Sequence, residues 1–358
     1  MQRNFILTDI MKTGDHRSYE QFIDTHSLAD QEFDCTGEYY TLHQYELDNY
    51  HRKFALIDMR IHNNRLIGND AYRNDLYTRL ELLHQQGFVF ILTNPWESAD
   101  NIKSQIFVTG EKMKKIEIPY PYYTWTGGVS WFWSFMYHKH KDNKPQVTHK
   151  WPKIHEFLYL NKATREHRVK LYNKLLKQNI LDNSIYTFVN MEPPRRLQEK
   201  YEIPGIDPKN YPRWGMDQDI YGLPYSDSVC SLVSETNDND YEIFMTEKIW
   251  KPIMAQHTFV IHGNHLYLQK LREMGFKTFS SHFDESYDLE RDPDKRIDKI
   301  VSLCKELQKK NWQDVYLQTK ALRQHNYDTF FNSEKLSMEV NKTLQLFLEF
   351  ADAGQVPS

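Results

Sequence analysis

Cysteine, proline and glycine are scarce in this 358-residue sequence, and neither sign of charge dominates. The three cysteines, Cys35, Cys230 and Cys304, are odd in number and widely spaced, which excludes a disulfide framework and favours a reducing compartment. The 13 glycines and 14 prolines are too few for a low-complexity linker protein. Lys and Arg number 45 against 49 Asp and Glu, so the basic excess typical of nucleic-acid backbone binding is missing.

Long apolar runs are also missing, with one partial exception. Residues 118–137 carry no charge, but they include Pro119, Pro121 and the pair Gly127-Gly128, which suit a membrane span poorly. We interpret this stretch as an aromatic loop followed by a short buried helix. The apolar run at the N-terminus is too short for a signal peptide. We therefore expect a cytoplasmic protein without a transmembrane helix.

Aromatic residues are abundant: 23 Tyr, 20 Phe and 8 Trp. In a polar chain, Tyr and Trp suit surfaces that stack on sugars, although protein cores use them as well. Tyr123 and Trp125 are therefore candidates for stacking on the sugar of an acceptor substrate. The neighbouring glycine pair favours an exposed Trp125. For Trp131 and Trp133 a packed aromatic core is the more frequent explanation.

Hydrophobic patterning alternates between strands and helices. The pattern in the first half predicts strands at 4–11, 54–61 and 88–92, with a helix at 70–86 that Gly87 ends. In the second half it predicts strands at 156–160, 184–189, 228–233 and 258–262, and helices at 165–178, 247–256, around 297–307 and around 336–347. This alternation indicates α/β domains with parallel sheets. The simplest architecture has two such domains, 1–150 and 151–358, with a ligand cleft between them.

The stretch 231–263 is the most informative part of the sequence. A strand ends near Val233, and Thr246 can cap a helix that begins at Glu247. Lys248 lies in the first turn, where the helix dipole disfavours a cation unless an anion docks there as well. Glu247 beside it could accept hydrogen bonds from ribose hydroxyls. The alternative is an ordinary surface helix that has no ligand.

This stretch resembles the donor-binding motif of the α-1,3-fucosyltransferases, glycosyltransferase family 10. The residues that carry the resemblance are Ser234-Glu235-Thr236, Asp240-Tyr241, Thr246-Glu247-Lys248-Ile249-Trp250 and Phe259-Val260-Ile261-His262-Gly263. The resemblance implies a GT-B-like fold, in which two Rossmann-like domains face each other across a cleft. It also implies a GDP-linked sugar donor in the C-terminal domain, bound by Glu247 at the ribose and Lys248 at the diphosphate, with Glu235 and Thr246 in the same site. Thr236 departs from the family pattern, which has Asn there.

Two shorter matches resemble the same family. Arg168, which follows Leu160-Asn161, matches the arginine that helps to hold the diphosphate, and a guanidinium can hold two phosphate oxygens at once. Its alternative is an exposed helix arginine. Glu97, in the segment 92–98, matches the glutamate expected to be the catalytic base; its alternative is an unpaired exposed carboxylate.

Further acidic residues have less specific patterns. Glu285 follows the last predicted strand and could touch donor hydroxyls, or else cap the helix that contains Arg296. The Asp-x-Asp pattern at 238–240 has the form used by metal-dependent glycosyltransferases, but it recurs at 217–219 and 292–294. A metal site also needs three or more converging ligands. We expect no metal and no cofactor, because the nucleotide-sugar is a substrate.

The sequence thus predicts an inverting, metal-independent glycosyltransferase that moves fucose or a related sugar to a hydroxyl of a glycan or other acceptor. Glu97 would be its general base. The first domain would bind the acceptor and the second the donor. One alternative is a catalytically inactive glycan-binding relative. Another is an enzyme that adds a sugar to a nucleobase in DNA, a reading that rests on the lysines at 112–115 and 139–141 and that the overall charge does not favour.

Overall fold

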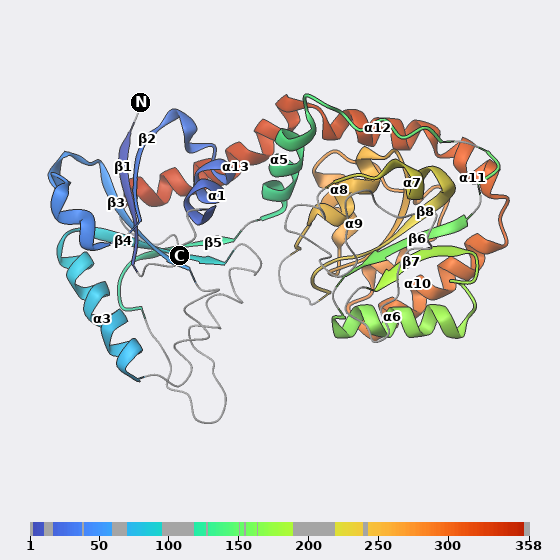
Figure 1. The fold of residues 1–358 in the computed structure, drawn as a ribbon, viewed down its shortest axis with the longest axis horizontal. Helices are drawn as coiled ribbons and strands as arrows, with labels where there is room; N and C mark the ends of the chain where they lie inside the picture. Colours follow the sequence, from blue (N-terminus) through green and yellow to red (C-terminus); the bar gives the residue numbers. More distant parts are fainter. Residues whose placement is uncertain are drawn as a thin grey trace. The chain divides into compact units, whose positions relative to one another are not determined.

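The computed structural model describes residues 3–10, 17–37, 39–58, 70–94, 118–126, 128–149, 151–153, 155–162, 164–188, 219–238 and 243–353. The chain divides into two compact units, Met1–Ser134 with Leu336–Ser358, and Phe135–Lys335. Each unit contains one parallel sheet with helices around it (Figure 1). The α/β class predicted from the sequence is confirmed. The expectation of a cleft between two facing domains stays a prediction.

The first unit is built on a five-stranded parallel sheet with the order β2-β1-β3-β4-β5. Its strands are β1 (Asn4–Asp9), β2 (Glu32–Thr36), β3 (Arg52–Asp58), β4 (Phe88–Asn94) and β5 (Tyr122–Thr126), and its helices include α1 (Arg17–Thr25) and α3 (Asp70–Gln85). Strands β1, β3 and β4 and helix α3 were predicted. Gly87, at φ +83°, follows α3 in the left-handed conformation that glycine adopts without strain.

The uncharged aromatic stretch forms β5 and most of α5 (Gly128–His140). The helix was expected, but the strand stands where we predicted a loop. Among the described residues, no helix combines the length and apolarity that crossing a membrane requires. Trp131 and Trp133 are buried, as expected. Trp125 is buried too, with 1% of its surface exposed, so the prediction of an exposed Trp125 is wrong.

The burial of Trp125 follows from the direction of its strand. Residues two apart in a strand point to the same face, so Tyr123 and Trp125 point to the same side of the sheet. There the rings of Trp125 and of Phe22, from α1, form a T-shaped pair with centroids 5.4 Å apart, and the ring centroids of Tyr123 and Phe347 are 5.6 Å apart. Both side chains therefore contribute to the core of the first unit.

The last helix, α13 (Ser333–Ala353), corrects the predicted domain boundary, because most of it belongs to the first unit. Phe347 is fully buried, with ring centroids 6.1 Å from Phe5 on β1 and 5.2 Å from Phe54 on β3. Arg3 donates to the carboxylate of Asp352 at 2.8 Å and fixes the end of the helix. The apolar spacing predicted the helix correctly but does not specify which sheet it covers.

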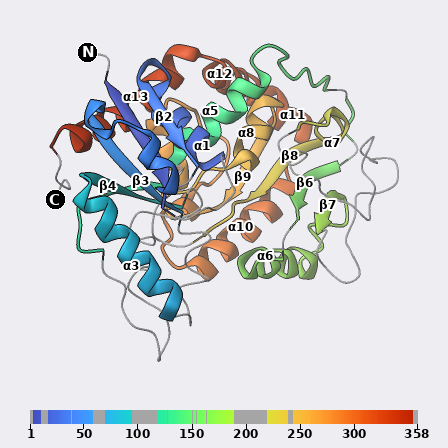
Figure 2. The same cartoon turned by 60° about the vertical axis from the view of Figure 1, so that its left-hand side comes forward.

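The second unit contains a four-stranded parallel sheet with the order β7-β6-β8-β9. Its strands, all four of them predicted, are β6 (His155–Asn161), β7 (Ser184–Phe188), β8 (Ser228–Ser234) and β9 (Thr258–His262). The helices described here are α6 (Glu166–Lys177), α7 (Gly222–Asp227), α8 (Glu247–Met254), α9 (Tyr267–Glu273), α10 (Pro293–Gln308), α11 (Trp312–Gln318) and α12 (Lys320–Phe330). Helices α6 and α10 lie side by side in both views (Figures 1 and 2), and Lys174 on α6 pairs with Asp298 on α10 at 2.5 Å.

A buried histidine in the first unit makes folding stability depend on pH. His26 is fully buried, donates from Nδ1 to the carbonyl of Phe22 at 2.9 Å and accepts at Nε2 from the Tyr123 hydroxyl at 3.2 Å. Burial lowers its pKa from 6.5 to about 4. Between these two pH values the unfolded chain takes up a proton that the folded chain does not, so stability decreases as the pH falls.

We predict that His26→Gln flattens the pH dependence of the melting temperature between pH 6.5 and 4. The histidine contributes up to about 1.4 kcal/mol per pH unit in this window. The exposed His138, changed to Gln, is the control and should leave the slope as in the wild type. An unchanged slope in the His26 variant would refute this assignment.

Candidate functional site

The sheet of the second unit places one edge in the position where α/β proteins bind ligands. From β6 the chain continues to β7 on one side, and β8 then lies on the other side of β6. At such a reversal, the segments that follow the two central strands diverge and leave room beyond the carboxyl ends of the strands. The segment that starts at Glu235 follows β8, and the segment that leads into α6 follows β6. Most of the residues predicted for the donor site belong to these segments or to α8.

Glu235 is the centre of the local structure. It is fully buried, and its carboxylate accepts four hydrogen bonds. Thr246 donates from its hydroxyl at 2.6 Å and from its backbone N–H at 3.2 Å, the hydroxyl of Tyr267 donates at 2.6 Å, and the N–H of Thr236 at 3.3 Å. The carboxylate therefore ties the end of β8 to the start of α8. The structure places Glu235 inside the protein, where it positions its neighbours.

Tyr267 reaches this carboxylate because the chain has a glycine after β9. A Cβ on Gly263 would lie only 2.7 Å from the ring of Tyr267. Any larger residue would push the ring away from Glu235. Beside the carboxylate and in a buried setting, the pKa of the Tyr267 hydroxyl is raised well above its ordinary value, first by burial and then by the charge of Glu235. Tyr267 therefore stays a hydrogen-bond donor.

The start of α8 agrees with the sequence prediction. Thr246 is the N-cap, and its hydroxyl oxygen accepts from the backbone N–H of Lys248 at 3.4 Å. The ammonium of Lys248 donates to Glu247 Oε1 at 2.6 Å, to Thr246 Oγ1 at 3.0 Å and to Thr236 Oγ1 at 3.4 Å. Burial alone would raise the pKa of Glu247, but the charge and hydrogen bond of Lys248 outweigh it and lower that pKa. Glu247 and Lys248 thus form a half-buried ion pair at the helix N-terminus.

Arg168, on α6, is buried rather than exposed, with 3% of its surface accessible. Its Nε and Nη2 donate to the backbone carbonyl of Glu235 at 3.1 and 2.8 Å. Arg165, one turn earlier, donates to the carbonyl of Thr236 at 3.1 Å. Arg168 and Lys248 therefore both contact the two-residue segment 235–236, from α6 and from α8.

A second cluster at the same strand ends was not predicted. His167 donates from Nε2 to the carbonyl of Glu235 at 3.0 Å, and its Nδ1 lies 3.6 Å from the carboxylate of Asp238. The fully buried His262, at the end of β9, lies 3.6 Å from the other carboxylate oxygen. Burial lowers the pKa of both imidazoles, that of His167 to about 4, so both are neutral at pH 7. The sequence shows only scattered histidines here, because these contacts join residues 24 to 71 positions apart.

A buried arginine fixes the backbone at Asp238. Arg296, on α10, donates to the carbonyls of Asp238 at 3.0 Å and Gly263 at 2.6 Å, so it fixes the backbone on both sides of the cluster. Burial raises the pKa of Asp238, but the neighbouring imidazoles of His262 and His167 and the charge of Arg296 lower it on balance. Within the described ranges, no three His, Cys, Asp or Glu side chains are arranged to hold a metal ion.

Other predicted site residues make different contacts or lie outside the described residues. Glu285 accepts from the Thr278 hydroxyl at 2.7 Å and from the Phe279 N–H at 2.6 Å, which ties it to the segment after α9. Glu285 does not cap α10 either. The cap is Asp292, whose side chain accepts from the backbone N–H groups of Asp294 and Lys295. Tyr123 and Trp125 are core residues of the first unit. The positions 97, 112–115, 217–218 and 239–241 lie outside the described residues.

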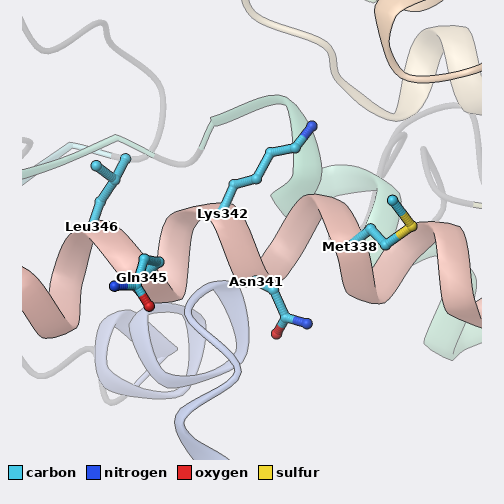
Figure 3. Close-up of a pocket in the computed structure, with 5 residues that line it drawn as sticks. All are labelled: Met338, Asn341, Lys342, Gln345 and Leu346. Atoms are coloured by element: carbon cyan, nitrogen blue, oxygen red, sulfur yellow. The ribbon is translucent and has the colours of Figure 1, made fainter.

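The first unit has an open depression of about 600 Å³ along α13, which none of these residues lines. Figure 3 shows the side chains that line it, all from this one helix: Met338, Asn341, Lys342, Gln345 and Leu346. Met338 and Leu346 are exposed there by 65% and 55%.

Comparisons with known proteins find similarity among solved structures. No family model and no curated protein matches the chain. Among solved structures, the chain is similar to one described as an alpha1,3-fucosyltransferase with GDP-fucose. The identity is 10% and the TM-score 0.42, over 96% of this chain and 91% of that one. At these values the likeness supports no activity.

We predict that Tyr267→Phe destabilises the protein by about 1–3 kcal/mol, because the buried carboxylate of Glu235 loses one hydrogen bond. Denaturant unfolding measures the change. Tyr137→Phe, at a half-buried tyrosine of α5, is the matched control and should stay within about 0.5 kcal/mol of the wild type. Equal losses of unfolding free energy in the two variants would show that the hydrogen bond from Tyr267 to Glu235 gives no particular stability, and would contradict this prediction.

Proposed function

We propose that the second unit binds a nucleotide-sugar, with GDP as its nucleotide, and that the chain is an inverting glycosyltransferase which needs no metal. The diphosphate would lie at the N-terminus of α8. One observation carries the proposal: two cations, Arg168 and Lys248, contact the same segment 235–236 at the carboxyl edge of the sheet, beside the strand reversal. This edge is where α/β sheets bind nucleotides.

The chemistry of the α8 terminus supports a phosphate ligand. The first N–H groups of a helix point outward and carry partial positive charge, and the ammonium of Lys248 adds a full charge beside them. The Lys248 side chain remains 24% exposed, so solvent and ligand can reach it. The carboxylate of Glu247 next to it can accept from the ribose hydroxyls. Nearby positive charge also stabilises a departing diphosphate, the role that a metal has in other transferases.

Arg168 has a narrower part in this proposal than the sequence predicts. Two of its five N–H donors, on Nε and Nη2, are already used on the Glu235 carbonyl, so the N–H groups of Nη1 and the second one of Nη2 are left for phosphate oxygens. Its main contribution is a buried positive charge together with the placement of the segment 235–236. Arg165, on the exposed side of the same helix, offers a more accessible guanidinium.

The acceptor side of the reaction stays a proposal that rests on the sequence. Glu97 would remove the proton of the acceptor hydroxyl as the new glycosidic bond forms, and the diphosphate would leave from the opposite face of the sugar. Because Trp125 is buried in the core, it is not part of this proposal.

Lys248→Ala tests the donor site. Removal of one preorganised charge contact should weaken catalysis by about 2–3 kcal/mol, measured as transfer or hydrolysis of the GDP-sugar. In a thermal-shift assay, GDP at 100 times its dissociation constant should stabilise the wild type by about 2.7 kcal/mol and the variant much less.

Lys270→Ala is the matched control, because Lys270 also pairs with a glutamate, Glu273 on α9, at 3.7 Å. This variant should respond to GDP as the wild type does. A wild type that responds to neither GDP nor UDP, or a Lys248→Ala variant with unchanged response, would contradict the proposed function.

A further inference from the structure

Lys248, the cation proposed to bind phosphate, already has a protein acceptor for each of its N–H donors. An ammonium has three N–H donors, and Lys248 has three acceptors within hydrogen-bond distance: Glu247, Thr246 and Thr236. The contact with Glu247 is the shortest and the only one with a charged partner. An anion that binds Lys248 must therefore compete with the carboxylate of Glu247.

This competition has a cost that depends on the ligand. Only 11% of the Glu247 side chain is exposed, so water cannot fully solvate a carboxylate that has lost its lysine. The incoming negative charge would also lie beside it. A bare anion such as pyrophosphate brings charge and acceptors at neutral pH but nothing that satisfies a carboxylate. A nucleoside diphosphate also carries two ribose hydroxyls, and each can donate a hydrogen bond to Glu247.

We propose that Glu247 is a specificity-determining residue that admits nucleoside diphosphates and excludes bare inorganic anions. In the ligand-free protein its carboxylate occupies Lys248 in place of a phosphate. When the ligand binds, the carboxylate exchanges the ammonium for the ribose hydroxyls, and the ammonium exchanges the carboxylate for the phosphate. This inference rests on the proposed function, because it needs a phosphate at Lys248.

The backbone geometry keeps this exchange local. Thr246 is tied to Glu235 by two hydrogen bonds, and Glu235 is fully buried, so the start of α8 is fixed. Glu247 and Lys248 lie on the first turn of that fixed helix. Rotation of their side chains is then enough for the exchange, without movement of the helix.

Titration calorimetry with GDP and inorganic pyrophosphate tests the inference. In the wild type, pyrophosphate should bind at least about tenfold more weakly than GDP. Glu247→Gln removes the competing charge, so the affinity for pyrophosphate should rise about tenfold, while the affinity for GDP stays level or falls. Glu339→Gln is the matched control, since Glu339 pairs with Lys342 on α13 at the same 2.6 Å and should change neither affinity.

The outcomes separate the inference from the proposed function. A wild type that binds neither ligand contradicts both. A wild type that binds GDP, with a Glu247→Gln variant that binds pyrophosphate no better, contradicts the inference alone. A second test uses the wild type alone. The analogue 2′,3′-dideoxy-GDP lacks both ribose hydroxyls and should bind at least about tenfold more weakly than GDP. Equal affinity for the two ligands would overturn the inference.

Discussion

The buried carboxylate of Glu235 is the group on which the other contacts of the site depend. It fixes the start of α8 through Thr246 and holds Tyr267 over Gly263, while the carbonyl of the same residue accepts from Arg168 and His167. A buried charge with four hydrogen bonds is stable only if all of its partners stay in place. This one residue therefore couples the end of β8 to α6 and α8, and it sets where the charges of the site lie.

The positive charges around Glu235 have different tasks. Arg296 and Arg168 are buried and spend their donors on backbone carbonyls, so they shape the segments that follow β8 and β9. Lys248 and Arg165 are more accessible and are the ones that a ligand can reach. A site of this kind keeps its geometry without a ligand, which reduces the conformational cost of binding one. Glu247 adds selectivity for the ligand in this proposal. A phosphate that binds Lys248 takes the ammonium away from the Glu247 carboxylate, which then needs another hydrogen-bond donor.

The sequence predicts the elements of this protein better than their contacts. The Thr258–His262 strand and the Thr246 cap follow from local patterns, which a single stretch of chain contains. Strand β2 was not predicted because it is a short, mostly exposed edge strand with only two apolar residues, Phe33 and Cys35. The role of Glu235, the burial of Arg168 and the packing of α13 depend on partners 11 to 349 positions away, which no local pattern encodes. The predicted donor residues Thr246, Glu247 and Lys248 do meet at one point, while Glu285 and Trp125 do not join them.

The most direct test of the account is a crystal structure of the protein with GDP bound. We expect the diphosphate at the first turn of α8, within hydrogen-bond distance of the Lys248 ammonium, and the ribose hydroxyls on the carboxylate of Glu247. Glu235 should keep its hydrogen bonds to Thr246 and Tyr267 in that structure. GDP bound away from α8, with the Glu247–Lys248 pair intact, would contradict the central claim.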